Sequence, residues 1–421
     1  MGERYAVTHS DFYEQVKERL IRYAKINTQS RPLSTVSPST SCQKDLACEL
    51  YKELCLLGLD SVYYDASACV VYAKIPSTLS SKKHAEPFGL IAHIDTAPDA
   101  SGEHVKPWVL EQYDGSDIVL NKEQSIVMLA SDYPNLNRYI GQDLILTDGT
   151  TLLGGDDKAS IAAIMTMAEY LMAHPEIPHG TICLAFTPDE EVGGLAKDLD
   201  LNRFGAKVAY TLDGDHLGYY EDETFNASEA IIEIEGLSVH TGTAKGIMKN
   251  AVDIASMFLS SLPPSKKPQY TSGTEGFFHV ISCNATCEHA RIELIIRDFD
   301  QDRFAARENL IRSIAEKLDR QFGGVSVRII EQYRNMHEVL DTVPYLIDRL
   351  RTAISDCGIT PVSEPFRGGT DGAALSFRGL PCPNLSAGYE NAHGRFEYVP
   401  IQSMEKNVQI LLRLCELFIE E

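Results

Sequence analysis

The sequence predicts an α/β fold, with a mostly parallel sheet flanked by helices and a smaller ferredoxin-like (βαββαβ) domain inserted into the main one. Apolar runs such as 88–92 and 181–186 are nearly continuous, as expected for strands buried on both faces. Stretches with helical spacing alternate with these runs. Acidic residues or His follow each run at once, which is typical of the carboxyl edge of a parallel sheet.

The main domain is expected to comprise residues 1–223 and 335–421. Its predicted helices, from spacing at i, i+3 and i+4, lie at 9–26, 43–57, 157–172, 343–356 and 402–420. Its predicted strands lie at 69–75, 88–92, 181–186 and 207–212. The polar, turn-rich region 97–145 is expected to form loops and short strands beside the sheet.

The pattern changes near residue 224, where apolar and polar residues begin to alternate. Strand-like runs are found at 229–235, 276–283, 290–298 and 325–331. Helix-like stretches cover 248–262 and 302–321. The resulting order βαββαβ predicts a split sandwich over 224–334, inserted into the main domain.

Charge and composition exclude several kinds of partner. The chain has 38 Lys and Arg against 60 Asp and Glu, a net charge of −22, which argues against nucleic acid and anionic membranes. No apolar run approaches the roughly 18 residues of a membrane span, and the N-terminus lacks the apolar stretch of a signal peptide. Scattered cysteines without a disulfide framework favour a reducing compartment, so we expect a cytoplasmic protein.

Polar residues that follow the predicted strands, or open the helix at 157–172, indicate a metal site. They are His93, Asp95, Asp156, Glu190, Glu191 and Asp213, together with His393 late in the chain. Singly, each has an ordinary explanation as a strand end, a helix start or a turn. Together they are ligands of the kind that bind Zn²⁺, Mn²⁺ or Co²⁺. So many carboxylates at one edge would repel one another unless cations held them.

Eight short motifs occur in one order along the chain, at 93–96, 152–158, 186–193, 210–214, 239–246, 296–300, 368–372 and 391–393. By these motifs the chain resembles the peptidase T family of tripeptide aminopeptidases. That family lies within a two-domain dizinc peptidase superfamily that also includes aminoacylases and dipeptidases. Gly155 and Ser160 replace other small residues of the pattern, and Thr241 stands where Pro often occurs, but no expected ligand is missing.

The resemblance implies two bound Zn²⁺ ions, with Co²⁺ or Mn²⁺ as substitutes. His93, Asp156 and Asp213 would bind one ion. Asp156, Glu191 and His393 would bind the second, with Asp156 as the carboxylate shared by both.

The resemblance also implies the roles of the acidic neighbours. Asp95 would orient the imidazole of His93, because residues two apart in an extended chain lie on one face. Glu190 would be the general base for a metal-bridged hydroxide that attacks the scissile carbonyl. The family further implies a cis peptide bond between Asp156 and Asp157.

The inserted domain would act as a lid that supplies substrate-binding residues. The resemblance implies that His240 donates to the oxyanion and that Arg297 helps to hold the substrate carboxylate, with Arg367 beside it. Without the resemblance, His240 is a surface histidine and Arg297 pairs with Asp298 or Asp300.

The expected function is a metal-dependent aminopeptidase that removes the N-terminal residue from short peptides, above all tripeptides. One alternative is a dipeptidase or aminoacylase-type amide hydrolase with the same ligands and base. An alternative of another class is a non-catalytic metal-binding or assembly protein, against which the intact Glu190 argues. The open sheet edge of the inserted domain is compatible with a homodimer.

Overall fold

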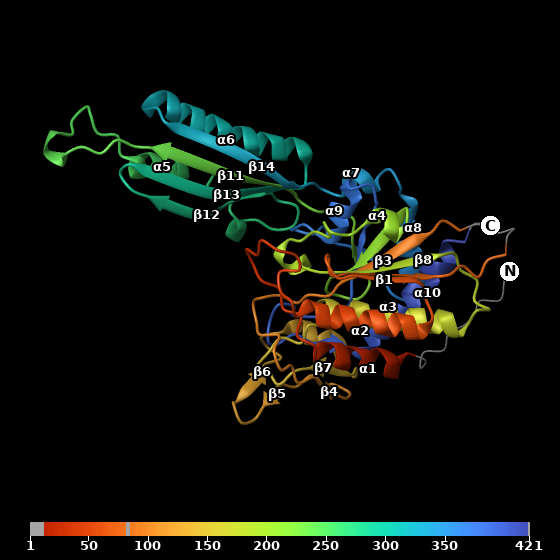
Figure 1. The fold of residues 1–421 in the computed structure, drawn as a ribbon. Coiled ribbons are helices and arrows are strands. Elements are labelled where there is room, and N and C mark those ends of the chain that lie inside the picture. Colours follow the sequence, from red (N-terminus) through yellow and green to blue (C-terminus); the bar gives the residue numbers. More distant parts are fainter. Residues whose placement is uncertain (1–11, 81–84, 420–421) are drawn as a thin grey trace. The chain divides into compact units, whose positions relative to one another are not determined.

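The computed structural model describes residues 12–80 and 85–419, which form two units (Figure 1). Unit 1 comprises the described residues up to Asp222, Glu338–Glu364, and the described residues from Thr370 onward. Unit 2 comprises Glu223–His337 and Pro365–Gly369.

An eight-stranded sheet forms the centre of unit 1, in the order β1-β2-β8-β3-β9-β16-β10-β15. These strands are β1 (Asp60–Asp65), β2 (Val70–Ile75), β8 (Ile182–Thr187), β3 (Phe88–His93), β9 (Val208–Leu212), β16 (Asn384–Leu385), β10 (Tyr219–Glu221) and β15 (Val362–Ser363). The four central strands, β8, β3, β9 and β16, run parallel to one another. Every residue of β3, β8 and β9 is buried, as their continuous apolar sequences predict.

Helices cover both faces of this sheet. They are α1 (Tyr13–Ala24), α2 (Gln43–Leu57), α3 (Gly155–Ala173), α4 (Leu201–Phe204), α8 (Tyr345–Asp356), α9 (Asp371–Phe377) and α10 (Ile401–Leu417), while the short α7 (His337–Leu340) begins at the last residue of the main segment of unit 2. The helix α3 packs against β3 and between α1 and α10, whereas α4 contacts β2 and β8, and α9 contacts β9 (Figure 1). The start of α3, which carries two adjacent aspartates, is thereby placed next to the end of β3.

The region between β3 and α3 forms short elements beside the main sheet. They are β4 (Trp108–Leu110), β5 (Ile118–Asn121), β6 (Ile126–Met128), the 3-10 helix η1 (Pro134–Tyr139) and β7 (Leu144–Leu146). With β17 (Val399–Pro400), strands β7 and β4 make a three-stranded sheet, and β5 pairs with β6. This agrees with the loops and short strands that the sequence predicts for 97–145.

Unit 2 contains a four-stranded antiparallel sheet in the order β12-β13-β11-β14. Its elements, in chain order, are β11 (Asn226–Glu235), α5 (Ala251–Ser261), β12 (Phe277–Ala285), β13 (His289–Asp298), α6 (Gln301–Phe322) and β14 (Val325–Tyr333). Apolar side chains of the sheet, such as Ile232 and Ile292, form one core with Phe258 of α5 and Ile311 of α6. The elements follow one another in the βαββαβ order that the sequence predicts.

A short segment of the late chain, Pro365–Gly369, belongs to unit 2, whereas the sequence places it with the main domain. Phe366 forms a parallel β-bridge with Thr224 and donates its N–H to the carbonyl of Glu223 at 2.9 Å. These backbone contacts join the segment to the beginning of unit 2.

The ends of two predicted helices, residues 9–11 and 420, lie outside the described residues. Within 12–80 and 85–419, none of the helices combines the length and apolarity that crossing a membrane requires.

Candidate metal centre

Three neighbouring parallel strands bring the predicted ligands to one edge of the main sheet. His93 is the last residue of β3, Asp213 follows β9, and Glu190 and Glu191 begin a 3-10 helix, η2 (Glu190–Val192), that follows β8. Asp156 is at the start of α3, which packs against β3. Because the carboxyl ends of parallel strands meet at one edge, residues far apart in the sequence become neighbours here.

The Asp156 carboxylate lies between two histidines. Its Oδ1 is 2.9 Å from Nε2 of His93, and its Oδ2 is 3.2 Å from Nε2 of His393. Asp156 is buried, while the His393 ring is half exposed. Each oxygen thus faces a different histidine, which is the arrangement that a carboxylate shared by two cations requires.

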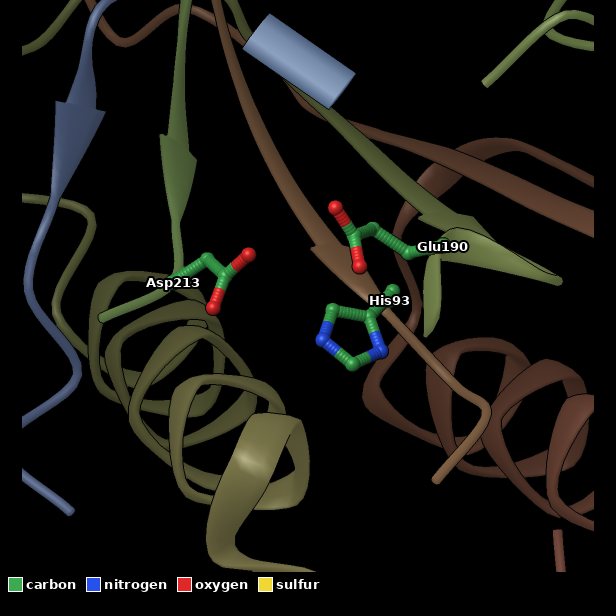
Figure 2. Close-up of side chains that lie close together, drawn as sticks. All are labelled: His93, Glu190 and Asp213. Atoms are coloured by element: carbon green, nitrogen blue, oxygen red, sulfur yellow. The ribbon is translucent and has the colours of Figure 1, made fainter. Parts of the chain in front are cut away.

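Among residues 12–80 and 85–419, two groups of donor atoms are compact enough to hold a metal ion, with the atoms of each group within 4.8 Å of one another. One group is His93, Glu190 and Asp213, whose side chains point toward one another in Figure 2. The other is His93, Asp156 and Glu191. His393 extends the second group, because its Nε2 is 2.9 Å from Oε2 of Glu191.

The adjacent glutamates therefore separate, Glu190 toward Asp213 and Glu191 toward Asp156. The grouping differs from the predicted one in two respects. His93, rather than His393, stands in the group of Asp156 and Glu191. Glu190, rather than Asp156, completes the group of His93 and Asp213 in this structure.

The carboxylates of the site are electrostatically unfavourable neighbours. Burial and the charge of Asp156 raise the pKa of Glu191 to about 8 and that of Asp213 to about 6. Burial and the charge of Asp213 raise the pKa of Glu190 well above its usual value. Divalent cations would offset this repulsion, and oxygen and imidazole donors suit Zn²⁺, Mn²⁺ or Co²⁺, so the residues present fit a metal pair.

The same carboxylates raise the pKa values of the two histidines and so favour their charged forms. Burial alone would lower the pKa of His93, but its hydrogen bonds to Asp156 and Asp95 raise it well above the usual value. Hydrogen bonds to Asp156 and Glu191 raise the pKa of His393 to about 11. Both shifts favour the protonated imidazolium beside these carboxylates.

Asp95 is fully buried and contacts both His93 and the turn that carries Glu190 and Glu191. Its carboxylate accepts the backbone N–H groups of Glu190 at 2.9 Å and Glu191 at 3.2 Å. Its Oδ1 is 3.4 Å from Nδ1 of His93, and its own carbonyl oxygen is closer, at 3.1 Å. An acceptor beside Nδ1 favours the tautomer that leaves Nε2 free to bind a metal.

Two further carboxylates support the predicted ligands, and the sequence did not reveal either role. Asp157 accepts the backbone N–H of His93 at 3.1 Å, and the peptide bond between Asp156 and Asp157 is cis, as the family resemblance predicts. Glu397 accepts backbone N–H groups from the turn that carries Asp156. Its one sequence signal is a charged residue inside the otherwise apolar run 396–399.

The predicted substrate residues belong to unit 2. His240 precedes the 3-10 helix η3 (Thr241–Thr243); its ring is exposed, and Nδ1 accepts the N–H of Gly242 at 3.2 Å. An exposed ring of this kind is accessible to a substrate.

Arg297 is buried, and burial lowers its pKa. Its guanidinium donates to the carbonyls of Ser228 and Ile296, at 3.2 and 3.0 Å, and to Oε1 of Gln332 at 2.8 Å. Neither Asp298 nor Asp300 is among these acceptors. The Asp298 carboxylate instead binds two other arginines, Arg303 at 3.1 Å and Arg307 at 2.7 Å.

Arg367 holds a loop of unit 2. It donates to the carbonyls of Gly273 and Glu275, the latter at 3.0 Å, and to Oγ1 of Thr271 at 3.1 Å. Its guanidinium also lies 5.1 Å from the ring centre of Phe225. Both arginines therefore use part of their hydrogen-bonding capacity on the backbone of their own unit.

A family model described as peptidase family M20/M25/M40 matches residues 153–417, and the chain belongs to this family. Peptidase T of Clostridium botulinum (strain Okra / Type B1) is 47% identical over 407 residues, 96% of this chain and 99% of that protein. The resemblance to peptidase T that the motifs predict is thereby confirmed.

Solved structures confirm the α/β fold class. The aminopeptidase PepT of Bacillus cereus superposes with a TM-score of 0.75 at 20% identity, covering 96% of this chain and 98% of that one. Bacillus subtilis YXEP, described as a dinuclear metal-binding peptidase, has a TM-score of 0.63 at 13% identity, covering 96% and 97%. At these identities the likeness concerns the fold.

Proposed function

We propose that the chain is a zinc-dependent aminopeptidase that releases the N-terminal residue of short peptides, above all tripeptides. The observation that carries this proposal is the Asp156 carboxylate, with one oxygen facing His93 and the other facing His393. A buried carboxylate in that position can serve two cations at once. Co²⁺ and Mn²⁺ suit the same donors.

The proposed ligands divide into two sets. His93, Asp156 and Asp213 hold one ion, and Asp156, Glu191 and His393 hold the other. Glu190 remains as the general base, because its neighbour Glu191 is turned toward His393 and these five ligands suffice for two ions that share one of them.

When bound, two metal ions lower the pKa of a water molecule and stabilise negative charge on the substrate carbonyl oxygen. Glu190 accepts the proton of that water and delivers it to the leaving amine nitrogen. Asp95 holds the turn in place for this task through the backbone N–H groups of Glu190 and Glu191. The chain thus supplies the proton carrier and the support that orients it.

We propose that unit 2 recognises the substrate. His240, with its exposed ring, donates to the carbonyl oxygen that develops negative charge. Arg297 and Arg367 bind the carboxylate of the peptide, for which each guanidinium has more N–H donors than its described bonds use.

The variant Glu190→Gln tests the division between ligand and base. We expect it to bind two equivalents of Zn²⁺ with wild-type affinity and to lose about 100- to 10,000-fold in kcat. Full peptidase activity in this variant would refute the catalytic assignment. Loss of one equivalent of zinc would make Glu190 a ligand instead, as its proximity to His93 and Asp213 permits.

Substrate class is tested by a panel of di-, tri- and tetrapeptides, free and N-acetylated, with added Zn²⁺, Co²⁺ or Mn²⁺. We expect free tripeptides to be cleaved fastest and a chelator to abolish cleavage. Faster hydrolysis of N-acetylated amino acids would support the aminoacylase alternative. An absence of hydrolysis with every metal would support a non-catalytic protein.

A further inference from the structure

The Glu397 carboxylate accepts three backbone hydrogen bonds from Asp156 and the turn that precedes it. Its side chain is buried, with the residue 2% exposed. Oε2 accepts the N–H groups of Leu153 at 2.8 Å and Gly154 at 2.7 Å, and Oε1 accepts the N–H of Asp156 at 2.9 Å. All three partners are donors, so the ionised carboxylate, which is an acceptor only, fits the position.

The turn and the segment around Glu397 are in close contact. A Cβ added to Gly155 would lie 2.4 Å from Cγ2 of Val399 and 3.1 Å from Oε1 of Glu397. Glycine at this position therefore allows the backbone of the turn to approach the carboxylate closely enough for the bond from Asp156. This is a steric reason for Gly155.

The same segment carries another proposed ligand. Glu390 and Tyr398 form an antiparallel bridge with hydrogen bonds in both directions, 2.9 and 3.1 Å long, which closes a hairpin around His393. Just before the hairpin, Tyr389 donates its hydroxyl to Oδ1 of Asp213 at 2.7 Å. The stretch 389–398 thus contacts or carries ligands from three different parts of the chain.

We infer that Glu397 is a positioning residue that fixes Asp156 between the two metal ions by tying its turn to the hairpin that carries His393. The inference rests on the proposed metal pair. A purely structural carboxylate would only satisfy the free N–H groups ahead of α3. One of the three bonds of Glu397 is to the N–H of Asp156, so loss of this bond would displace the proposed shared ligand as well as free an N–H group at the start of α3.

The variant Glu397→Gln tests this role with almost no change in shape. One amide oxygen can accept the N–H groups of Leu153 and Gly154, but the amide nitrogen then faces the N–H of Asp156 and that bond is lost. Glu397→Asp keeps the charge but is shorter by one methylene, so it cannot reach all three donors. Glu405→Gln is the matched control, because Glu405 is also a buried glutamate of unit 1 and lies on α10.

Each full-length variant is stripped of metal and titrated with Zn²⁺ in competition with a chromophoric chelator. Circular dichroism first establishes that the protein is folded, and Glu397→Asp replaces Glu397→Gln if the latter does not fold. We expect wild type and Glu405→Gln to bind two equivalents with the same affinities. In the Glu397 variants the affinity for each ion should fall about 10- to 100-fold, because the ligand they disturb is shared.

The visible absorption spectrum of the Co²⁺-substituted protein gives a readout that a general loss of stability would not change. We expect altered bands in Glu397→Gln and unaltered bands in Glu405→Gln. Folded Glu397 variants with wild-type zinc affinities and an unchanged cobalt spectrum would overturn the inference and leave the metal pair intact. Wild type that binds fewer than two equivalents would overturn the proposed metal pair and this inference together.

Discussion

The metal centre of unit 1 and the substrate-binding candidates of unit 2 use charged side chains in opposite ways. In unit 1 the charges that support the backbone are separate from the proposed ligands. Asp95, Asp157 and Glu397 accept backbone N–H groups of the segments that carry the ligands. In unit 2 the candidates themselves, Arg297 and Arg367, donate to backbone carbonyls.

The two sets of residues differ in how many of their side-chain donor and acceptor atoms remain available for a metal or a substrate. In unit 1, supporting carboxylates leave the ligand side chains free to converge on one small volume. In unit 2, the arginines share their donors between local structure and any substrate. We therefore expect variants of the metal centre to change metal binding and activity, and variants of the arginines to change stability as well.

The largest effect is expected from Asp156→Asn, which weakens the ligand that we propose both ions share. Both zinc equivalents should be lost at micromolar metal, and kcat/KM should fall by about 1,000-fold or more, since each metal supplies several kcal/mol of charge stabilisation. Metal analysis and tripeptide hydrolysis measure the two effects. Retention of one tightly bound equivalent would show that Asp156 is not shared.

His240→Ala should separate the proposed role of unit 2 in substrate binding from metal binding in unit 1. We expect kcat to fall about 100- to 1,000-fold, the usual effect of removing an oxyanion donor. Zinc content and melting temperature should stay unchanged, because the ring is exposed and its described bond is to its own turn. A change in zinc stoichiometry would contradict the assignment of His240 to the substrate alone.

Asp95→Asn tests the support of the glutamate turn. The amide can offer an oxygen to only one of the two N–H groups, of Glu190 and Glu191, that the carboxylate now accepts. Zinc affinity should therefore fall about 10- to 100-fold, as is usual for residues that orient ligands. Chelator competition measures the affinity, and wild-type binding would mean that the turn keeps its shape without Asp95.

Arg367→Met should lower the free energy of unfolding of unit 2 by about 1 kcal/mol, because bonds from Arg367 to the loop at 271–275 are lost. It should also raise KM for tripeptides if the guanidinium binds their carboxylate. Denaturant unfolding and steady-state kinetics separate the two roles. A raised KM with unchanged stability would assign Arg367 to the substrate alone.

The smallest effect on metal binding and catalysis is expected at Glu405, which belongs neither to the metal centre nor to the substrate-binding candidates. Burial raises its pKa from 4.5 to about 7. A carboxyl whose pKa is raised by folding destabilises the folded state once it ionises, so stability is lost as the pH rises from 4.5 through 7. Glu405→Gln should therefore be more stable than wild type at pH 8 and equal to it near pH 4.5. Thermal melts at both pH values measure this, and an advantage independent of pH would contradict it.

Elements with strong local patterns were predictable from the sequence. The helix α2 has the predicted limits, 43–57, because Gly58 with φ 77° ends it in the left-handed conformation. The strands β3 and β8 were evident from continuous apolar runs. The strands β10, β15 and β16 have only two or three residues each, too few to show any periodicity.

The sequence predicted which residues form the candidate site, but not the hydrogen bonds that hold those residues in place. The residues His93, Glu190 and Asp213 follow strands that the sequence reveals, and their convergence follows from the parallel sheet. The backbone N–H of Asp156 donates to the Glu397 carboxylate, 241 positions away in the sequence. Because any residue could supply that N–H, the bond leaves no pattern in the sequence. Arg297 donates to two backbone carbonyls and to the side chain of Gln332, and none of these partners leaves a local pattern, whereas the sequence without the family resemblance suggested Asp298 or Asp300.

The proposed function depends above all on two metal ions sharing the carboxylate of Asp156. Crystals of the full-length protein grown with Zn²⁺, with anomalous diffraction recorded on both sides of the zinc absorption edge, test it most directly. We expect two anomalous peaks, one beside each oxygen of Asp156, with His93 at the first and His393 at the second. A single peak, or two peaks of which only one contacts Asp156, would contradict it.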